Sequence, residues 1–113
     1  MPDDAVGRLR AICLALPEAE ERETWGETNF RVREKIFALV GGARTSFVCK
    51  APPGVQAILV GADPDRFFVP AYVGHKGWVG VRLTGDPDWD EIATLVTRSY
   101  RMTAPKKLAA LMG

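Results

Sequence analysis

Hydrophobic residues at the start of the chain recur with the spacing of a helix. Over residues 3–16 they lie three and four positions apart, which predicts an amphipathic helix that Pro17 ends. Residues 18–27 are rich in acids and show no such period, so we interpret them as a connection. The pattern then changes to alternation in the sequence FRVREKIFALV, residues 30–40. Alternation predicts two strands, with a turn at residues 34–35 between them.

In the second half of the chain, helical and strand-like spacings of hydrophobic residues again follow one another. The elements expected there are a strand at 45–50, a helix at 53–61, strands at 67–72 and 78–83, a helix that begins at Asp88, and a short last helix after Pro105. Asp88 is a good N-cap because Glu91 follows three residues later, as in a capping box. Gly74–Gly77 would form the four-residue turn of the second hairpin.

The resulting order is helix, three strands, helix, two strands, helix and a short final helix. Hairpins joined by helices predict an α+β fold, in which helices cover one face of an antiparallel sheet. The 113 residues contain no repeat, linker or low-complexity segment. We therefore expect a single domain over residues 1–113.

Composition places the chain among globular proteins, with 47% hydrophobic and 26% charged residues. Its longest apolar runs are far shorter than the ~20 residues that cross a bilayer, and its first residues do not match a signal peptide. Cys13 and Cys49 lie far apart in apolar surroundings. A reduced, buried pair is expected, which suits a cytoplasmic protein that does not contact membranes.

The sequence offers no metal, cofactor or catalytic motif. Asp86, Asp88 and Asp90 match the first positions of a calcium loop, but its glycine and its final glutamate are missing, so helix capping explains these acids better. His75 is the sole histidine, and neither a nucleophile motif nor a phosphate loop is present. We expect a protein that is not an enzyme and that carries no cofactor.

Charge is distributed unevenly, although the net charge is only +1. Residues 1–27 carry seven acids and three bases, whereas residues 28–82 carry three acids and eight bases. The strand-rich middle of the chain is therefore basic, with a segment charge of +5 against −4 at the start.

Two stretches of this basic middle are candidate binding sites. In PAYVGHKGWVGVRL, residues 70–83, a hairpin would carry His75 and Lys76 at its tip and Arg82 on its outgoing strand. The Gly-x-x-Gly loop in this stretch is typical of KH domains, but there it joins two helices, and here both flanks are expected strands. Earlier, Arg31 and Arg33 would share one sheet face, followed by Lys35 in the turn. The alternative interpretation is that the glycines only shape a turn and the cations only keep the sheet face hydrated.

The stretches TWGETNFRVREKIFA, PAYVGHKGWVGVRL and DWDEIATLVTRSYRMTAPKKL together resemble the MmcQ/YjbR family of small bacterial proteins. The resemblance implies an α+β fold with a "double wing" arrangement like that of DNA-binding proteins. The wings would be the hairpins near Arg31–Lys35 and His75–Lys76. Where relatives often have Gly-His-Pro-Thr-Phe, this chain has Gly-Glu-Thr-Asn-Phe at residues 26–30.

These observations lead to one hypothesis and two alternatives. The hypothesis is a non-enzymatic protein that binds DNA weakly, through phosphate contacts of the basic hairpins. The first alternative is a protein-interaction module, by analogy with the similar α+β arrangement of secretion-chaperone-like folds, that uses the acidic residues 18–27 and an exposed sheet edge. The second is a small-molecule binder with a pocket lined by Trp25, Tyr72 and Trp78. The sequence does not indicate an oligomeric state.

Overall fold

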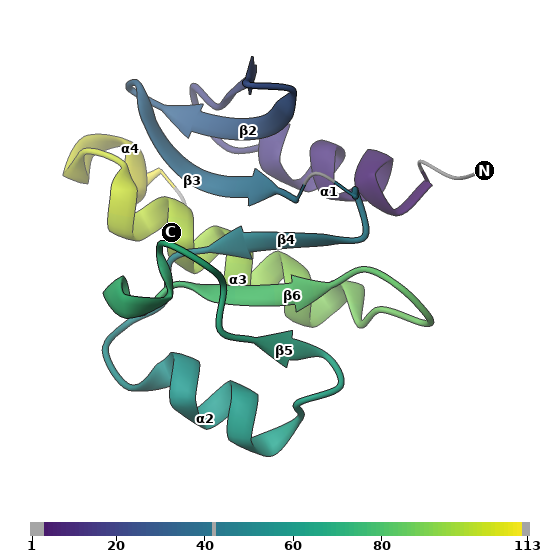
Figure 1. The fold of residues 1–113 in the computed structure, drawn as a ribbon. Helices are drawn as coiled ribbons and strands as arrows, with labels where there is room; N and C mark the ends of the chain where they lie inside the picture. The colour runs from purple at the N-terminus through teal and green to yellow at the C-terminus, as the bar shows by residue number, and fades with distance from the viewer. Residues whose placement is uncertain (1–3, 42, 112–113) are drawn as a thin grey trace.

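The computed structural model describes residues 4–41 and 43–111. Its elements in chain order are α1 (Asp4–Leu14), β1 (Glu20–Thr24), β2 (Glu27–Val32), β3 (Lys35–Val40), β4 (Ser46–Cys49), α2 (Val55–Ala62), β5 (Phe67–Phe68), the 3₁₀ helix η1 (Gly74–Lys76), β6 (Val79–Arg82), α3 (Trp89–Thr103) and α4 (Lys106–Ala110). The predicted α+β class and the succession of hairpins and helices are confirmed (Figure 1).

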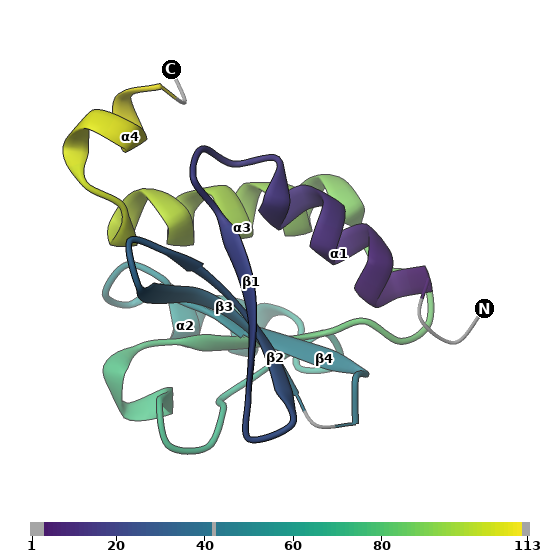
Figure 2. The ribbon, with the colours of Figure 1, turned by 90° about the horizontal axis from the view of Figure 1, so that it is seen from above.

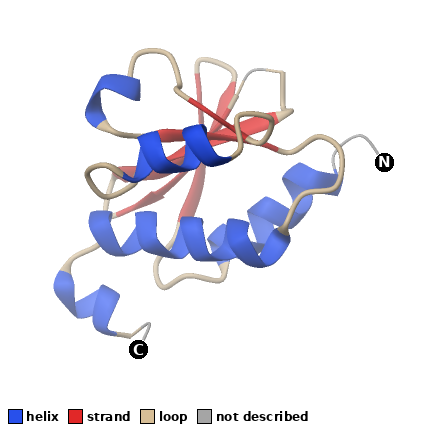
Figure 3. Cartoon of the chain, turned by 90° about the horizontal axis from the view of Figure 1, so that it is seen from below, coloured by secondary structure: helices blue, strands red, loops and turns tan. Residues whose placement is uncertain are grey.

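The strands form one sheet in the order β1-β2-β3-β4-β6-β5, and every neighbouring pair is antiparallel. Helices α1 and α3 lie together on one face of this sheet (Figure 2). Figure 3 shows α1 and α3 together on one side of the strands. In Figure 1 the opposite face is turned toward the viewer, and no helix of the described residues crosses in front of β2, β3 and β4. We call this second surface the open face.

The core lies between the sheet and the α1–α3 layer. Val6, Leu9 and Cys13 of α1 are fully buried, as one stripe of an amphipathic helix should be. In α3, the buried ring of Tyr100 packs edge-on against Phe37 of β3, with centroids 5.4 Å apart. The Tyr100 hydroxyl donates to the Pro17 carbonyl at 2.6 Å, so α3 also fixes the connection after α1.

The acidic segment is a strand, which corrects its interpretation as a connection. β1 pairs along its whole length with β2, from Glu20 opposite Arg31 to Thr24 opposite Glu27. It is an edge strand with almost every side chain exposed, and its residues on both faces are charged or polar. Charged edge strands resist pairing with other chains, but they show no apolar alternation from which a strand could be predicted.

The first basic hairpin turns one residue earlier than expected. Arg33 and Glu34 are the two turn residues, with left-handed φ angles of 50° and 68°. Lys35 already pairs with Val32 in the sheet. This two-residue turn has the backbone handedness that matches the twist of the flanking strands.

The second hairpin differs more from the prediction. The strand expected at 67–72 is only Phe67–Phe68, because Pro70 has no N–H with which to continue the ladder. Residues 74–76 form the 3₁₀ helix η1 in place of a hairpin tip. Gly77 follows η1 with a left-handed φ of 88°, which glycine adopts without strain. Gly74 is needed for a different reason, because a Cβ at this position would lie only 2.6 Å from Cγ1 of Val69.

Candidate functional site

A hollow of about 690 Å³ extends from the open face to the end of the sheet, where Met102 of α3 joins its lining. It is lined by Arg31, Glu34, Lys35, Ile36, Leu39, Lys50, Ala51, Val73, Lys76, Trp78 and Met102. Four of these residues are cations, one is an acid, and the remainder are apolar. We call this feature the cationic hollow. Its volume lies in the range of ligand pockets, and its chemistry suits an anion that also has an apolar part.

The four cations come from four different segments of the chain. Arg31 projects from β2, Lys35 begins β3, Lys50 follows the end of β4, and Lys76 belongs to η1. Sheet order places β2, β3 and β4 side by side, and the pairing of Arg31 with Ile36 and of Val32 with Lys35 brings Arg31 and Lys35 to the same end of the sheet. η1 then adds the fourth cation from the segment between β5 and β6.

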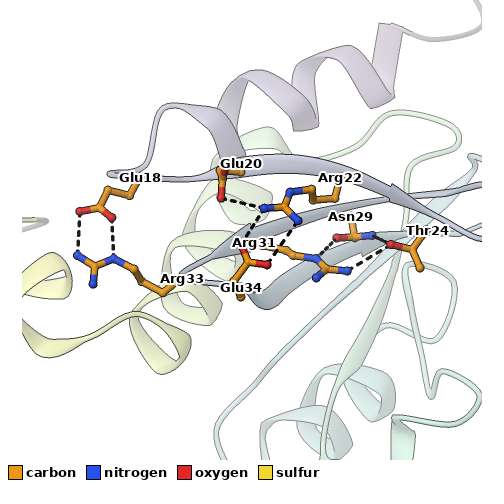
Figure 4. A network of polar contacts seen from close by, with 8 residues as sticks. All are labelled: Glu18, Glu20, Arg22, Thr24, Asn29, Arg31, Arg33 and Glu34. Carbon is orange, nitrogen blue, oxygen red and sulfur yellow. Dashed lines mark hydrogen bonds and ion pairs between the residues drawn. The ribbon is translucent and has the colours of Figure 1, made fainter.

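Arg31 is held in place by neutral partners. Its Nε donates to Oδ1 of Asn29 at 2.8 Å, and its Nη2 donates to Oγ1 of Thr24 at 3.2 Å (Figure 4). Asn29 is itself buried and donates to the same threonine hydroxyl. The guanidinium is therefore fixed in direction while its charge stays uncompensated by these contacts.

Lys50 lies among like charges. Partial burial lowers the pKa of its ammonium, and the nearby Lys35 and Lys76 lower that pKa further. Its Nζ lies 5.7 Å from the centroid of the Trp78 ring. The acid of the hollow, Glu34, is engaged with Arg22 at 2.7 Å (Figure 4). Lys35 and Lys76 are thus close enough to Lys50 to make its charged form less favourable.

The structure brings together only half of the six predicted cationic residues. Arg31, Lys35 and Lys76 line the hollow. Arg33 turns away and forms a bidentate pair with Glu18, at 2.6 and 3.1 Å (Figure 4). This pairing lowers the pKa of Glu18 and raises that of Arg33.

The other two predicted residues lie outside the hollow as well. Arg82 donates to the carbonyls of Pro64 and Asp65 at 3.1 and 3.3 Å, and its guanidinium lies 4.9 Å from the Phe68 ring. His75 is exposed on η1 but does not line the hollow. Lys50 was missed as a site residue, although its place on the polar side of the 45–50 strand pattern is the signal that could have found it.

The expected aromatic pocket does not form from its three residues. Trp78 lines the hollow, whereas Trp25 and Tyr72 are 96% and 93% exposed. Trp25 lies in the turn between β1 and β2, and Tyr72 lies between β5 and η1. A pocket shared by all three rings is thus excluded for the free protein.

The acids of the edge strand region are largely paired within the chain. Glu18 binds Arg33, Glu20 binds Arg22, and Glu21 binds Arg10. These are exposed pairs, so each contributes little to stability. Their effect is to occupy Arg10, Arg22 and Arg33 near the sheet edge, which leaves the four cations of the hollow outside these pairs.

Cys13 and Cys49 are free and buried, as predicted. Burial raises the pKa of both thiols, that of Cys49 to about 12, so neither is a reactive thiolate near neutral pH. Within residues 4–41 and 43–111, no group of three histidine, cysteine or acidic side chains could hold a metal ion. Asp88 accepts from the backbone N–H of Glu91 at 3.1 Å, as expected of the α3 cap.

None of the helices in the described part of the chain is long and apolar enough to cross a membrane.

Comparison with known proteins gives a family and a fold. The family model named YjbR matches residues 14–102. A crystal structure of the Deinococcus radiodurans protein DR2400, with the domain DUF419, is similar with a TM-score of 0.78. The two chains are 24% identical, and the match covers 90% of this chain and 80% of that one. At this identity the likeness shows the fold alone. No curated protein matches the chain.

Proposed function

The chain belongs to the YjbR family, and from this premise we propose that its open face binds nucleic acid without catalysing a reaction on it. The observation that supports the proposal is the cationic hollow itself. Arg31, Lys35, Lys50 and Lys76 face one concavity from four segments. Its one acid, Glu34, is already paired with an arginine. A row of phosphates would supply the missing counter-charge.

The parts of the hollow suit different parts of a nucleotide. Arg31, fixed by Asn29 and Thr24, offers its remaining N–H groups to a phosphate in a set direction. The lysines act as mobile point charges whose counterions are released on binding. Trp78 and Leu39 provide apolar surface for a sugar or a base.

The test is fluorescence anisotropy with labelled 12-nucleotide DNA, as a single strand and as a duplex, from about 50 to 200 mM salt. For three to four phosphate contacts we expect a log–log slope of about −2 to −3 on the single strand and about −3 to −4 on a duplex. The variant Lys35→Gln/Lys76→Gln should bind weakly with a shallower slope. The matched control is Lys106→Gln/Lys107→Gln, which removes the same charge from exposed positions of α4 outside the hollow and should bind like the native protein.

Equal losses in both double variants would mean that overall charge, and not the hollow, carries the binding. A second candidate function is favoured by the volume of the hollow and its apolar floor, namely binding of a small amphipathic anion. The same titration, repeated with nucleic acids of different length, distinguishes the two functions. A dinucleotide that binds as tightly as the 12-mer would favour the small ligand, whereas affinity that grows with length supports the polymer.

A further inference from the structure

Two aromatic side chains stand almost fully in solvent on segments next to the cationic hollow. Trp25 is 96% and Tyr72 is 93% exposed. The β1–β2 turn that carries Trp25 and the segment between β5 and η1 that carries Tyr72 both project away from α1 and α3 (Figures 2 and 3). Trp25 directly follows Thr24, whose hydroxyl binds Arg31 of the hollow, and Tyr72 directly precedes Val73, which lines it. Both rings therefore belong to segments that adjoin the hollow.

The backbone at both positions adopts a conformation that aromatic residues disfavour. Trp25 has a φ of 55° and Tyr72 a φ of 65°, in the left-handed region. A turn of the type at Trp25-Gly26 normally has asparagine or glycine at its first position. The rings gain almost nothing from the folded chain, since so little of either is covered. Strained backbone that presents an unused ring is a feature typical of binding surfaces.

The chemistry of the projecting segments argues against insertion into a duplex groove. The β1–β2 turn consists of Thr24, Trp25, Gly26 and Glu27, with an acid and no base. The sequence VPAYV, residues 69–73, also lacks a cation. Protein segments that enter grooves are rich in arginine and lysine, because phosphates line both groove edges. Here the cations lie in the hollow, and the projections carry aromatic faces.

We propose that the open face selects a single-stranded nucleic acid, with phosphates in the cationic hollow and bases stacked on Trp25 and Tyr72. This inference rests on the proposed function and specifies its substrate. A single strand exposes the faces of its bases, whereas a duplex buries them in its stack. A charged groove that tracks the backbone, combined with exposed aromatic rings, is how sequence-tolerant single-strand binding is built. Trp78, inside the hollow, offers a third ring.

The experiment compares three 12-nucleotide probes with the same label: oligo-dT, a duplex, and a strand of abasic sites with equal charge. The native protein should bind oligo-dT more tightly than the duplex or the abasic strand. Trp25→Ala and Tyr72→Ala should each weaken oligo-dT binding about 5- to 100-fold and leave the salt slope unchanged. On the abasic strand, neither substitution should have an effect, because no base is there to stack. Oligo-U in parallel tells whether the strand bound is DNA or RNA.

Leu111→Ala is the matched control, since it truncates an apolar side chain that is 70% exposed outside the hollow, and it should bind normally. Trp25→Asn is a second variant whose residue suits the left-handed backbone, so a folding defect cannot imitate the loss. Duplex binding at least as tight as oligo-dT binding, or aromatic variants that bind like the native protein, would overturn the inference. The hollow would still stand as a nucleic-acid site if the lysine double variant lost affinity. Absence of binding to every probe would overturn both proposals.

Discussion

Ser99 joins α3 to the sheet at the place where the sheet's own pairing is interrupted. The register between β2 and β3 shifts between Phe30 and Arg31, so Phe37 has no partner across that pair. The fully buried Ser99 hydroxyl donates to the Phe37 carbonyl at 2.6 Å and accepts from the Lys50 N–H at 2.9 Å. Ser99 thus provides the hydrogen bond for the Phe37 carbonyl at the bulge, and it fixes the backbone of Lys50, which lines the hollow.

Replacing this serine tests how much of the fold depends on it. Ser99→Ala leaves one buried carbonyl and one N–H without these bonds, at about 1–3 kcal/mol each, so we expect a loss of about 2–4 kcal/mol in unfolding free energy. Urea denaturation measures it. Thr94→Ala is the control, because the Thr94 hydroxyl is exposed and bonds only the carbonyl of Asp90 in its own helix. A change below about 0.5 kcal/mol for Ser99→Ala would show that water replaces the hydroxyl.

At the scale of elements, the β1–β2 turn at Trp25 and the β2–β3 turn at Arg33 can be compared by the same substitution, because both residues have a left-handed backbone. Trp25→Asn should raise the unfolding free energy by roughly 1 kcal/mol, because asparagine tolerates the left-handed backbone better than tryptophan does. The same substitution should weaken nucleic-acid binding, since the exposed ring is lost. Thermal denaturation and anisotropy on one preparation measure both changes.

Arg33→Asn is the control for the two opposite effects expected of Trp25→Asn, a gain in stability and a loss of nucleic-acid binding. Arg33 also begins a turn, with a φ of 50°, but it pairs with Glu18 and does not line the hollow. Relief of backbone strain is offset in part by loss of that exposed pair, so stability should change little or rise. Affinity should stay within about twofold of the native value. A Trp25→Asn protein that is less stable than the native one would show that the ring packs in solution.

These turns also show why part of the fold could be predicted and part could not. Alternation located β3 and β4, and the capping pair Asp88–Glu91 located the start of α3, because burial and capping leave local marks in sequence. β1 leaves none, since a charged edge strand buries no face. η1 depends on close contact between Gly74 and Val69, which is tertiary information.

For the molecule as a whole, segment charge predicted a basic region but not which cations are free. Three arginines of that region are used internally. Arg33 pairs with Glu18, Arg66 pairs with Asp63 and Glu91, and Arg82 binds backbone carbonyls. Except for Arg66 and Asp63, which are three positions apart, these pairings join residues distant in sequence, so counting charges could not assign them. Arg33 and Arg66 are paired with acids and Arg82 is bound to carbonyls, while Arg31 and three lysines line the hollow. This is how a chain of net charge +1 keeps a cationic surface.

The repulsion between the cations of the hollow lowers the stability of the folded state. Lys50 is the residue at which this effect can be measured, because its pKa responds to its neighbours. Burial first, and Lys35 and Lys76 next, lower its pKa below 10.5, so the unfolded chain holds this proton to higher pH. The charged side chain therefore destabilises the fold at neutral pH, and this penalty disappears as pH rises from the folded pKa towards 10.5. Lys50→Met keeps an unbranched apolar side chain in the hollow and removes the charge.

We expect Lys50→Met to melt at a higher temperature than the native protein at pH 7, because the cation–π contact it loses, at 5.7 Å and partly exposed, contributes only about 0.5 kcal/mol. The difference between the two melting temperatures should narrow as pH approaches 10.5, since native Lys50 then loses its charge. Lys106→Met, on exposed α4, should show neither effect. Oligo-dT should raise the melting temperature of the native protein more than that of Lys50→Met, because bound phosphate compensates the repulsion that the variant no longer has. A Lys50→Met protein that melts below the native protein at every pH would contradict this prediction. It would mean that the Lys50 ammonium already has its counter-charge within the folded chain, and the hollow would then not be an anion site.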